Sequence, residues 1–323
     1  MEVAHGVHRI ETPLGERFVC MFLLVGSENS LLIDTGLNDT PLKVLAPYLE
    51  RVGVRPERLG YVVTTHADFD HMGGNATMRE LAPRARFICH ALDRTWIEDI
   101  DKLIAENYGQ FNADHGLTDD EDVNRWIRAQ ACGTPIDVEV QGGERIRLDE
   151  GWWIELWHTP GHTRGHLSVY DPRSRTMIIA DSALYNALYT SAGVPAFPPT
   201  YRFVESYIAT IQRLRQTPIE TLLTSHYPVK RGAEVAEFLA ESRAFVDRVE
   251  SALRDTLQRA AEPVGMQALI AELSPKLGSW PGAASSFLIY PLAGHLERLV
   301  SYGMVEVAYR DGVLVYRWKG EKQ

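Results

Sequence analysis

Cysteine is scarce in this sequence, and its positions exclude two common kinds of site. The 323 residues contain 3 cysteines, Cys20, Cys89 and Cys132, which lie far apart and form no CxxC pair. This spacing provides neither a disulfide framework nor a zinc-thiolate site. We therefore expect three reduced thiols.

Long apolar runs are also missing. No window approaches the roughly 18 consecutive apolar residues that a membrane span needs. Residues 1–6 show no basic segment followed by an apolar run. We therefore expect a cytoplasmic protein that does not contact a membrane.

Basic residues are outnumbered. The sequence has 33 Lys and Arg against 43 Asp and Glu, which gives a formal net charge of −10. This charge opposes general attraction to nucleic acid, so we expect a small-molecule substrate and no nucleic-acid partner. Because 45% of the residues are hydrophobic, the chain can bury a core for one large domain and a smaller one.

Four side chains that bind metals readily occur within six residues. They are His66, Asp68, Asp70 and His71, between a predicted buried strand at 61–65 and a double glycine. On an extended chain the first three project to one side and His71 points elsewhere. Aspartate is depleted in strands, and crowded carboxylates raise one another's pKa unless a cation lies between them. The cluster therefore predicts a metal site rather than a strand end that meets water.

Three further side chains of this kind follow predicted strands later in the chain. His162 lies in the turn TPGHTRGH after the strand at 152–158, Asp181 follows the strand at 176–180, and His226 follows the strand at 220–224. With the first four they supply four His and three Asp, enough for two ions and an open position for water.

Other polar residues near these motifs have supporting roles in this scheme. We expect His158 and His166 to be orienting or core groups. Asp34 ends the strand at 30–34 and leaves two alternatives open. It either hydrogen-bonds the turn at Gly36 or supports the metal ligands.

The order of predicted elements indicates an α/β protein. Antiparallel strands at the start give way to a β-α-β pattern, and residues 91–131 carry helical spacing. We expect this acidic segment to be a helical insertion with a solvated face that covers one side of the site. The aromatic, proline-rich loop at 185–203 either caps the core or forms a wall over an apolar ligand.

The last part of the sequence predicts a separate unit. A long helix at 234–261 leads to a helix at 266–273, a helix at 285–303 interrupted at Pro291, and a hairpin, which is the pattern of a winged helix. Its presumed recognition helix places Arg298 beside Glu297, so packing or dimerisation, including a homodimer, is favoured over DNA reading. We place a catalytic domain at 1–248 and this unit at 249–323.

Taken together, the motifs resemble those of the metallo-β-lactamase superfamily. The resemblance covers residues 7–230 and includes Asp34-Thr35-Gly36, His66-x-Asp68-x-Asp70-His71-x-Gly73-Gly74, the turn around His162, Asp181 and Ser225-His226. It implies an αββα sandwich with a dinuclear site at one edge. The tail is similar to the winged-helix tail of the two-domain hydrolases of this superfamily.

The resemblance also implies two ligand sets. The first ion is assigned to His66, Asp68 and His162, the second to Asp70, His71 and His226, and Asp181 bridges them. One residue departs from the family pattern, because Asp68 stands where a second histidine is usual. The cofactors implied are two divalent ions, most simply Zn²⁺, with Mn²⁺ or iron as alternatives that the harder oxygen ligand favours.

The activity that these expectations imply is hydrolysis of a small ester, lactone or thioester by a metal-bridging hydroxide. In this scheme Asp70 orients the water or handles its proton, and Tyr227 or a residue of the aromatic loop supports the oxyanion. One alternative is a phosphodiesterase or endoribonuclease. Another is a non-catalytic, metal-bound ligand sensor that passes its signal through the tail.

Overall fold

The N-terminal half of the chain builds a seven-stranded sheet. In the computed structural model, which describes residues 1–117 and 120–320, the strands lie side by side in chain order. The first four are antiparallel, and the last three continue the sheet in parallel. They are β1 (Glu2–Ala4), β2 (Val7–Leu14), β3 (Arg17–Val25), β4 (Ser30–Ile33), β5 (Tyr61–Val63), β6 (Arg86–His90) and β7 (Val138–Val140).

A second sheet of six strands follows, in the order β15-β14-β11-β10-β9-β8. Only β11 and β14 are parallel, and the helix α8 (Val204–Arg215) connects them, as a parallel pair requires. The strands are β8 (Arg145–Asp149), β9 (Trp152–His158), β10 (Leu167–Asp171), β11 (Thr176–Ala180), β14 (Thr221–Thr224) and β15 (Lys230–Arg231). A short hairpin, β12 (Leu188–Tyr189) and β13 (Pro195–Phe197), lies between β11 and α8 in the chain.

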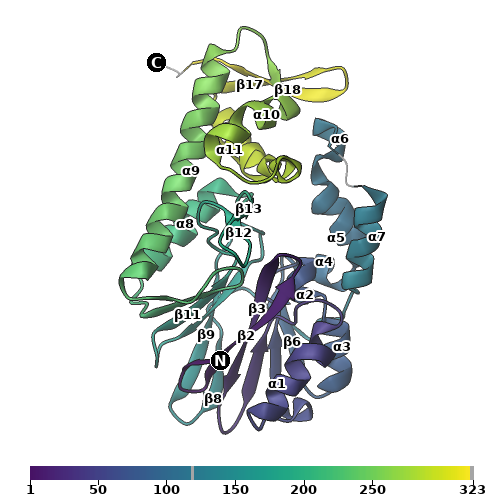
Figure 1. Cartoon of the computed structure of the whole chain (residues 1–323), viewed down its shortest axis with the longest axis vertical. Helices are drawn as coiled ribbons and strands as arrows, with labels where there is room; N and C mark the ends of the chain where they lie inside the picture. The colour runs from purple at the N-terminus through teal and green to yellow at the C-terminus, as the bar shows by residue number, and fades with distance from the viewer. Residues whose placement is uncertain (118–119, 321–323) are drawn as a thin grey trace.

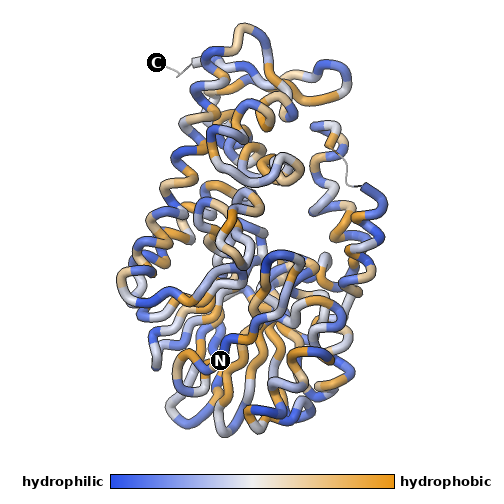
Figure 2. The backbone as a smooth tube through the Cα atoms, in the orientation of Figure 1, coloured by the Kyte–Doolittle hydropathy of each residue, from blue (hydrophilic) through white to orange (hydrophobic). Residues whose placement is uncertain are grey.

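The two sheets pack face to face and carry helices on their outer faces (Figure 1). Phe22 and Val63 of the first sheet share a buried core with Ile154 and Val169 of the second. Helices α1 (Ala46–Arg51) and α3 (Asn75–Leu81) cover one outer face, and α8 and α9 (Ala233–Arg259) cover the other. Apolar residues run along the strands between these helical layers (Figure 2). The expected α/β sandwich of αββα type is therefore confirmed.

The segment at 91–131 is helical, as predicted. Its helices form a column along one side of the molecule and reach the C-terminal elements, where Tyr309 donates a hydrogen bond to Asp114 (2.7 Å, Figure 1). Residues 118–119 of this segment lie outside the described residues. The helices are α4 (Arg94–Glu98), α5 (Ile100–Glu106), the 3-10 turn η3 (Tyr108–Phe111), α6 (Asn112–His115) and α7 (Glu121–Gln130).

The C-terminal elements follow the predicted order of helices and hairpin. The helix expected at 285–303 is divided, because Pro291 lies in the first turn of α11, where its missing N–H is tolerated. The winged-helix assignment stays a prediction, as does the boundary at 248, which α9 crosses. The elements are β16 (Val264–Gly265), α10 (Met266–Leu277), the 3-10 helix η4 (Gly282–Leu288), α11 (Ile289–Ser301), β17 (Val305–Arg310) and β18 (Val313–Trp318).

None of the described helices combines the length and the apolar character that a membrane span needs.

Candidate metal centre

The motif after β5 is not extended, which corrects one sequence expectation. The strand ends at Val63, and a short helix, α2 (Phe69–Met72), begins directly after Asp68. The helical turn brings His71 towards the other side chains instead of pointing it away, and its Nε2 lies 4.0 Å from Asp70 Oδ2. The expectation that His71 projects elsewhere was wrong because it assumed a strand through the whole motif.

The double glycine allows close backbone packing behind this helix. A Cβ on Gly73 would lie 2.4 Å from the Gln130 carbonyl oxygen, and one on Gly74 would lie 2.5 Å from that of Thr35. Both distances are shorter than a van der Waals contact. Only glycine therefore lets α2 lie this close to the end of α7 and to the turn after β4.

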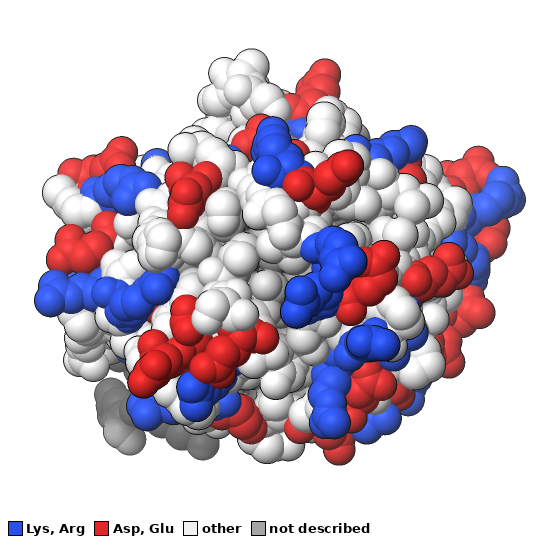
Figure 3. Space-filling model, turned by 90° about the horizontal axis from the view of Figure 1, so that it is seen from below, with Lys and Arg blue, Asp and Glu red and all other residues white. Residues whose placement is uncertain are grey.

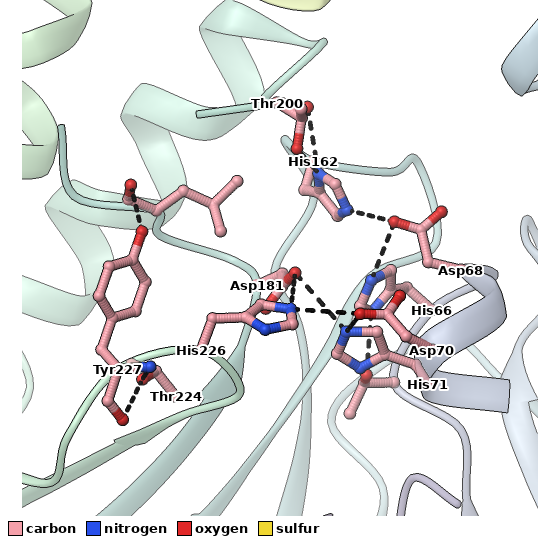
Figure 4. A network of polar contacts seen from close by, with 12 residues as sticks. His66, Asp68, Asp70, His71, His162, Asp181, Thr200, Thr224, His226 and Tyr227 are labelled. Carbon is pink, nitrogen blue, oxygen red and sulfur yellow. Dashed lines mark hydrogen bonds and ion pairs between the residues drawn. The ribbon is translucent and has the colours of Figure 1, made fainter. Parts of the chain in front are cut away.

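The structure brings all seven predicted metal ligands together (Figure 4). Their ligand atoms form three overlapping groups, and within each group the atoms lie no more than 4.8 Å apart. Two of these groups are the ligand sets that the family resemblance implied, and Asp181 lies between them. The groups are His66, Asp68 and His162; Asp70, His71 and His226; and His66, His71 and Asp181.

The distances within the cluster suit ligands around a cation. Asp181 Oδ2 lies 3.3 Å from His226 Nε2 and 3.6 Å from His71 Nε2. Asp68 Oδ2 lies 2.9 Å from His162 Nε2 and 3.5 Å from His66 Nε2. Two ligands on a tetrahedral zinc ion, each about 2.0–2.1 Å from it, lie about 3.3 Å from one another.

Several buried polar atoms in the cluster have no hydrogen-bond partner among the described residues. They are Nε2 of His66, Nε2 of His71 and Oδ1 of Asp181. Buried polar groups in proteins are nearly always paired, because leaving one unpaired costs about 1–3 kcal/mol. A bound cation would satisfy all three atoms, so the donor set fits a metal ion.

Hydrogen bonds fix which nitrogen each histidine presents to the cluster. His162 and His226 place Nδ1 next to backbone carbonyl oxygens, of Thr200 at 3.1 Å and of Phe18 at 2.9 Å. A carbonyl oxygen only accepts, so Nδ1 carries the hydrogen and Nε2 offers its lone pair inwards.

The same rule holds for the other two histidines and assigns a role to Asp34. Asp34 Oδ2 accepts from His71 Nδ1 (2.8 Å) and from the Thr65 hydroxyl (2.8 Å). Since that hydroxyl hydrogen is used, its oxygen must accept from His66 Nδ1, 2.9 Å away. Asp34 itself has a φ of 59°, a backbone conformation that is uncommon outside glycine. Of the two roles left open for Asp34, the structure shows support of the histidines.

The charges of the cluster are strongly coupled. Burial opposes ionisation of Asp68 and Asp181, but the neighbouring histidines hold the pKa of each carboxyl below its usual range. Burial likewise opposes a charge on His162 and His71; Asp68 nevertheless raises the pKa of His162 to about 9, and Asp70 and Asp181 raise that of His71. The carboxylates therefore favour positive charge at the positions of Nε2, where a proton or a metal ion can supply it.

Two buried side chains support the cluster from behind, and one of them escaped the sequence analysis. Asp93 accepts hydrogen bonds from the Thr163 hydroxyl (2.6 Å) and the Gly165 amide (2.7 Å), which tie down the turn that carries His162. It follows strand β6, so the strand-end rule could have found it. His166 accepts from the Asp181 amide (3.2 Å), and burial lowers its pKa well below the usual value. The expected orienting or core role of His166 agrees with this geometry.

Tyr227 is not part of the cluster. Its hydroxyl lies 2.7 Å from the Leu184 carbonyl oxygen and 2.9 Å from that of Ala187, and its side chain points away from the metal ligands (Figure 4). Because the single hydroxyl hydrogen is directed at these carbonyl groups, Tyr227 does not fit the predicted role at an oxyanion. Its proximity to His226 in sequence was misleading, since neighbouring side chains point in different directions.

A cavity of ≈ 270 Å³ begins beside His226. The aromatic side chains of the loop at 185–203 fill both roles left open for it, the wall of a cavity and a cap on the core. Tyr185 and Tyr189 line the cavity, whereas Tyr201 is fully buried and stacks on Tyr207 in the core at 4.5 Å. The aromatic lining of the cavity consists of Phe18, Tyr185, Tyr189, Tyr227 and Phe238.

An αββα sandwich with a His and Asp cluster at its strand ends defines a class of proteins built to bind metal ions. Residues 14–226 match the family model of the Metallo-beta-lactamase superfamily, and the chain belongs to that superfamily. The family resemblance seen in the sequence is therefore confirmed.

Two relatives are similar to this chain over part of its length. The chain is 26% identical over 227 residues to the Acyl-coenzyme A thioesterase MBLAC2 of Bos taurus, covering 64% of this chain and 72% of the relative. It is 26% identical over 178 residues to a Hydroxyacylglutathione hydrolase of Synechococcus sp. (strain JA-2-3B'a(2-13)), covering 55% and 53%.

Similar solved structures extend over almost the whole chain. A metallo-beta-lactamase family protein from Thermus thermophilus superimposes with a TM-score of 0.77 at 20% identity, covering 98% of this chain and 100% of the other. A Beta-lactamase domain protein from Burkholderia ambifaria gives 0.76 at 17% identity, covering 99% and 93%. At these identities the likeness concerns the fold.

Proposed function

We propose that this protein is a metal-dependent hydrolase that acts on a small ester, lactone or thioester. The observation that carries the proposal is the buried cluster of four Nε2 atoms and three carboxylates, in which His66, His71 and Asp181 have unpaired atoms. The names of the relatives, a thioesterase and a hydroxyacylglutathione hydrolase, support the choice of substrate class.

The seven residues would hold two divalent ions. His66, Asp68 and His162 would hold one, Asp70, His71 and His226 would hold the other, and Asp181 lies where it could serve both. Such ions lower the pKa of a water molecule towards neutrality and polarise a carbonyl oxygen. Zn²⁺ is the simplest occupant, with Mn²⁺ or iron as alternatives because of the oxygen ligand at Asp68.

The protein's own residues place the proton and the substrate. Asp70 directs Oδ2 towards His226 (3.6 Å) and His71 (4.0 Å), so we assign Oδ1 to accept the proton of the attacking water. The apolar part of the substrate occupies the aromatic cavity beside His226. Burial of this part excludes water from one side of the reacting carbonyl group.

No specific observation favours the phosphodiester alternative. A nuclease needs a basic groove for phosphate groups. The formal net charge of −10 opposes such binding in general. On the described part of the end that Figure 3 shows from below, acidic and basic side chains are interspersed.

The proposal is tested with purified protein loaded with Zn²⁺ or Mn²⁺ and supplied with a chromogenic ester, a lactone, a thioester and bis(p-nitrophenyl) phosphate. We expect hydrolysis of at least one carboxylic substrate, and loss of that activity after chelation. His226→Ala should lose one metal equivalent and most of the rate, whereas His5→Ala, whose side chain is 94% exposed, should lose neither. Metal-loaded protein that cleaves only the phosphodiester, or no substrate at all, would contradict the proposal.

A further inference from the structure

Asp68 is the residue at which this chain departs from the family pattern, and its two carboxylate oxygens have different surroundings. Oδ2 faces the histidines, at 2.9 Å from His162 Nε2 and 3.5 Å from His66 Nε2. Oδ1 lies 3.1 Å from the hydroxyl of Tyr108. Tyr108 begins the turn η3 in the helical insertion, 40 residues further along the chain.

The direction of this hydrogen bond is determined by its neighbours. The Phe69 amide lies 3.2 Å from the same hydroxyl oxygen, and an amide N–H only donates. The hydroxyl oxygen therefore accepts from Phe69 and directs its own hydrogen at Asp68 Oδ1. An ionised carboxylate only accepts, so both bonds are consistent with one orientation of the hydroxyl.

Aromatic packing holds Tyr108 in this position. Its ring meets the ring of Phe69 edge-on, with centroids 6.5 Å apart and planes at 73°. Phe69 in turn meets Trp126 of α7 in the same manner, at 5.1 Å and 75°. The metal-binding helix α2 and two parts of the insertion are thus packed together around the bond to Asp68.

We propose that Tyr108 is a positioning residue that makes Asp68 bind the metal ion through one oxygen only. Asp68 then resembles the usual histidine, which binds through one nitrogen. This inference rests on the proposed function, because it requires a metal ion at the set of His66, Asp68 and His162. A free carboxylate can bind a cation through either oxygen or through both. The hydrogen bond from Tyr108 occupies Oδ1 and fixes the side chain so that Oδ2 faces the ion.

The bond also orders the side chain of Asp68 before an ion binds. Oδ2 is then already held towards the cluster, so that less freedom of the side chain is lost on binding. The insertion therefore contributes to the metal centre itself, in addition to covering one side of it. Its tyrosine compensates for the exchange of histidine for aspartate at position 68.

The test is a double-mutant cycle in which metal affinity is measured by competition with a chromophoric chelator. Tyr108→Phe removes only the hydroxyl, and we expect the affinity for the Zn²⁺ ion at the set of His66, Asp68 and His162 to fall about 10- to 100-fold. In an Asp68→His background the same change should alter affinity by less than about twofold, the range of independent sites. Circular dichroism and thermal unfolding of the metal-free proteins show whether each variant is folded.

A matched control separates this role from general loss of a tyrosine hydroxyl. Tyr309→Phe removes another tyrosine–aspartate hydrogen bond, to Asp114 at 2.7 Å, and should leave both metal affinities unchanged. Unchanged affinity in Tyr108→Phe, or an equal loss in both backgrounds, would overturn the inference while the proposed function stands. Wild-type protein that retains no divalent ion would overturn both.

Discussion

At the scale of the residue, single buried acceptors decide which atom each histidine offers. Asp34 receives hydrogen bonds from His71 Nδ1 and from both the amide and the hydroxyl of Thr65, all at 2.8 Å. This leaves Nε2 of His71 free of hydrogen and directed at the cluster. Asp34, which is not itself a metal ligand, can thus determine the metal affinity of the cluster.

Asp34→Asn tests this role. The amide nitrogen would face a donor, so either His71 or Thr65 loses its acceptor, and we expect metal affinity about 10- to 100-fold lower. The unpaired buried group should also lower the free energy of unfolding by about 1–3 kcal/mol. Chelator competition and urea unfolding measure the two effects. Asp149→Asn, which changes an exposed carboxylate bonded to Ser27, is the control; an Asp34→Asn variant that matches it in both measurements would refute the assignment.

The sequence was most informative where a polar residue follows an apolar strand. That rule selected all seven residues of the cluster, because strand ends of one edge converge wherever a sandwich forms. A different criterion, proximity in sequence to His226, selected Tyr227 and was misleading. The strand-end rule could not identify Tyr108, because only the folding of the insertion against α2 brings that hydroxyl to Asp68.

At the scale of the element, a short strip at 200–203 connects the site to the C-terminal helices. The Thr200 carbonyl accepts from His162 Nδ1, and the Gly161 carbonyl accepts from the amides of Arg202 and Phe203, both at 2.8 Å. Helix α11 holds the other side of the strip. Its Glu297 accepts two hydrogen bonds from the Arg202 guanidinium, and His295 Nε2 lies 3.0 Å from the Tyr201 hydroxyl.

Gly294→Ala should disturb the metal centre from a distance. A Cβ at this position would lie 2.2 Å from the Arg202 carbonyl oxygen, so the strip must move away from α11 and take Thr200 with it. We expect a lower melting temperature and weaker metal binding at the set that contains His162.

The control for this prediction is another alanine substitution in the same unit. Gly282→Ala adds a Cβ that meets no atom within 4 Å, so its melting temperature and metal affinity should stay at wild-type values. If Gly294→Ala behaves like Gly282→Ala in chelator competition, the strip does not control His162.

The secondary structure was predictable where hydrophobic periodicity was clear. The long helix α9 lies close to its expected bounds, and the predicted C-terminal hairpin is present as β17 and β18. The turn into α2 was not predicted, because the strand composition of Tyr61 to Thr65 was extended through the motif. Asp68, a residue type common at helix N-caps, is in fact the N-cap of α2. The strand pairs only as far as Val63, which leaves the following residues free to turn.

At the scale of the whole molecule, one hydrophobic core extends from the second sheet into the C-terminal elements. Met177 and Ile179 of β11 belong to the same buried cluster as Leu253 of α9 and Leu292 of α11. Helix α9 runs through it without interruption across the proposed domain boundary at 248. The winged-helix unit and a homodimer stay predictions.

This continuous core predicts a single cooperative unfolding transition. In urea, intrinsic fluorescence and far-ultraviolet circular dichroism should report the same midpoint, because neither part can unfold without exposing the shared core. A saturating divalent ion should raise that midpoint, since it binds only the folded state. Two separated transitions would show that the C-terminal unit folds independently.

The cluster is proposed to hold two divalent ions, and the metal content of the purified protein tests this most directly. After incubation with excess Zn²⁺ or Mn²⁺ and exhaustive gel filtration, inductively coupled plasma mass spectrometry should find two ions per chain. His71→Ala and His226→Ala should each retain one. A wild-type content of one ion or less, or two ions in both variants, would contradict the account.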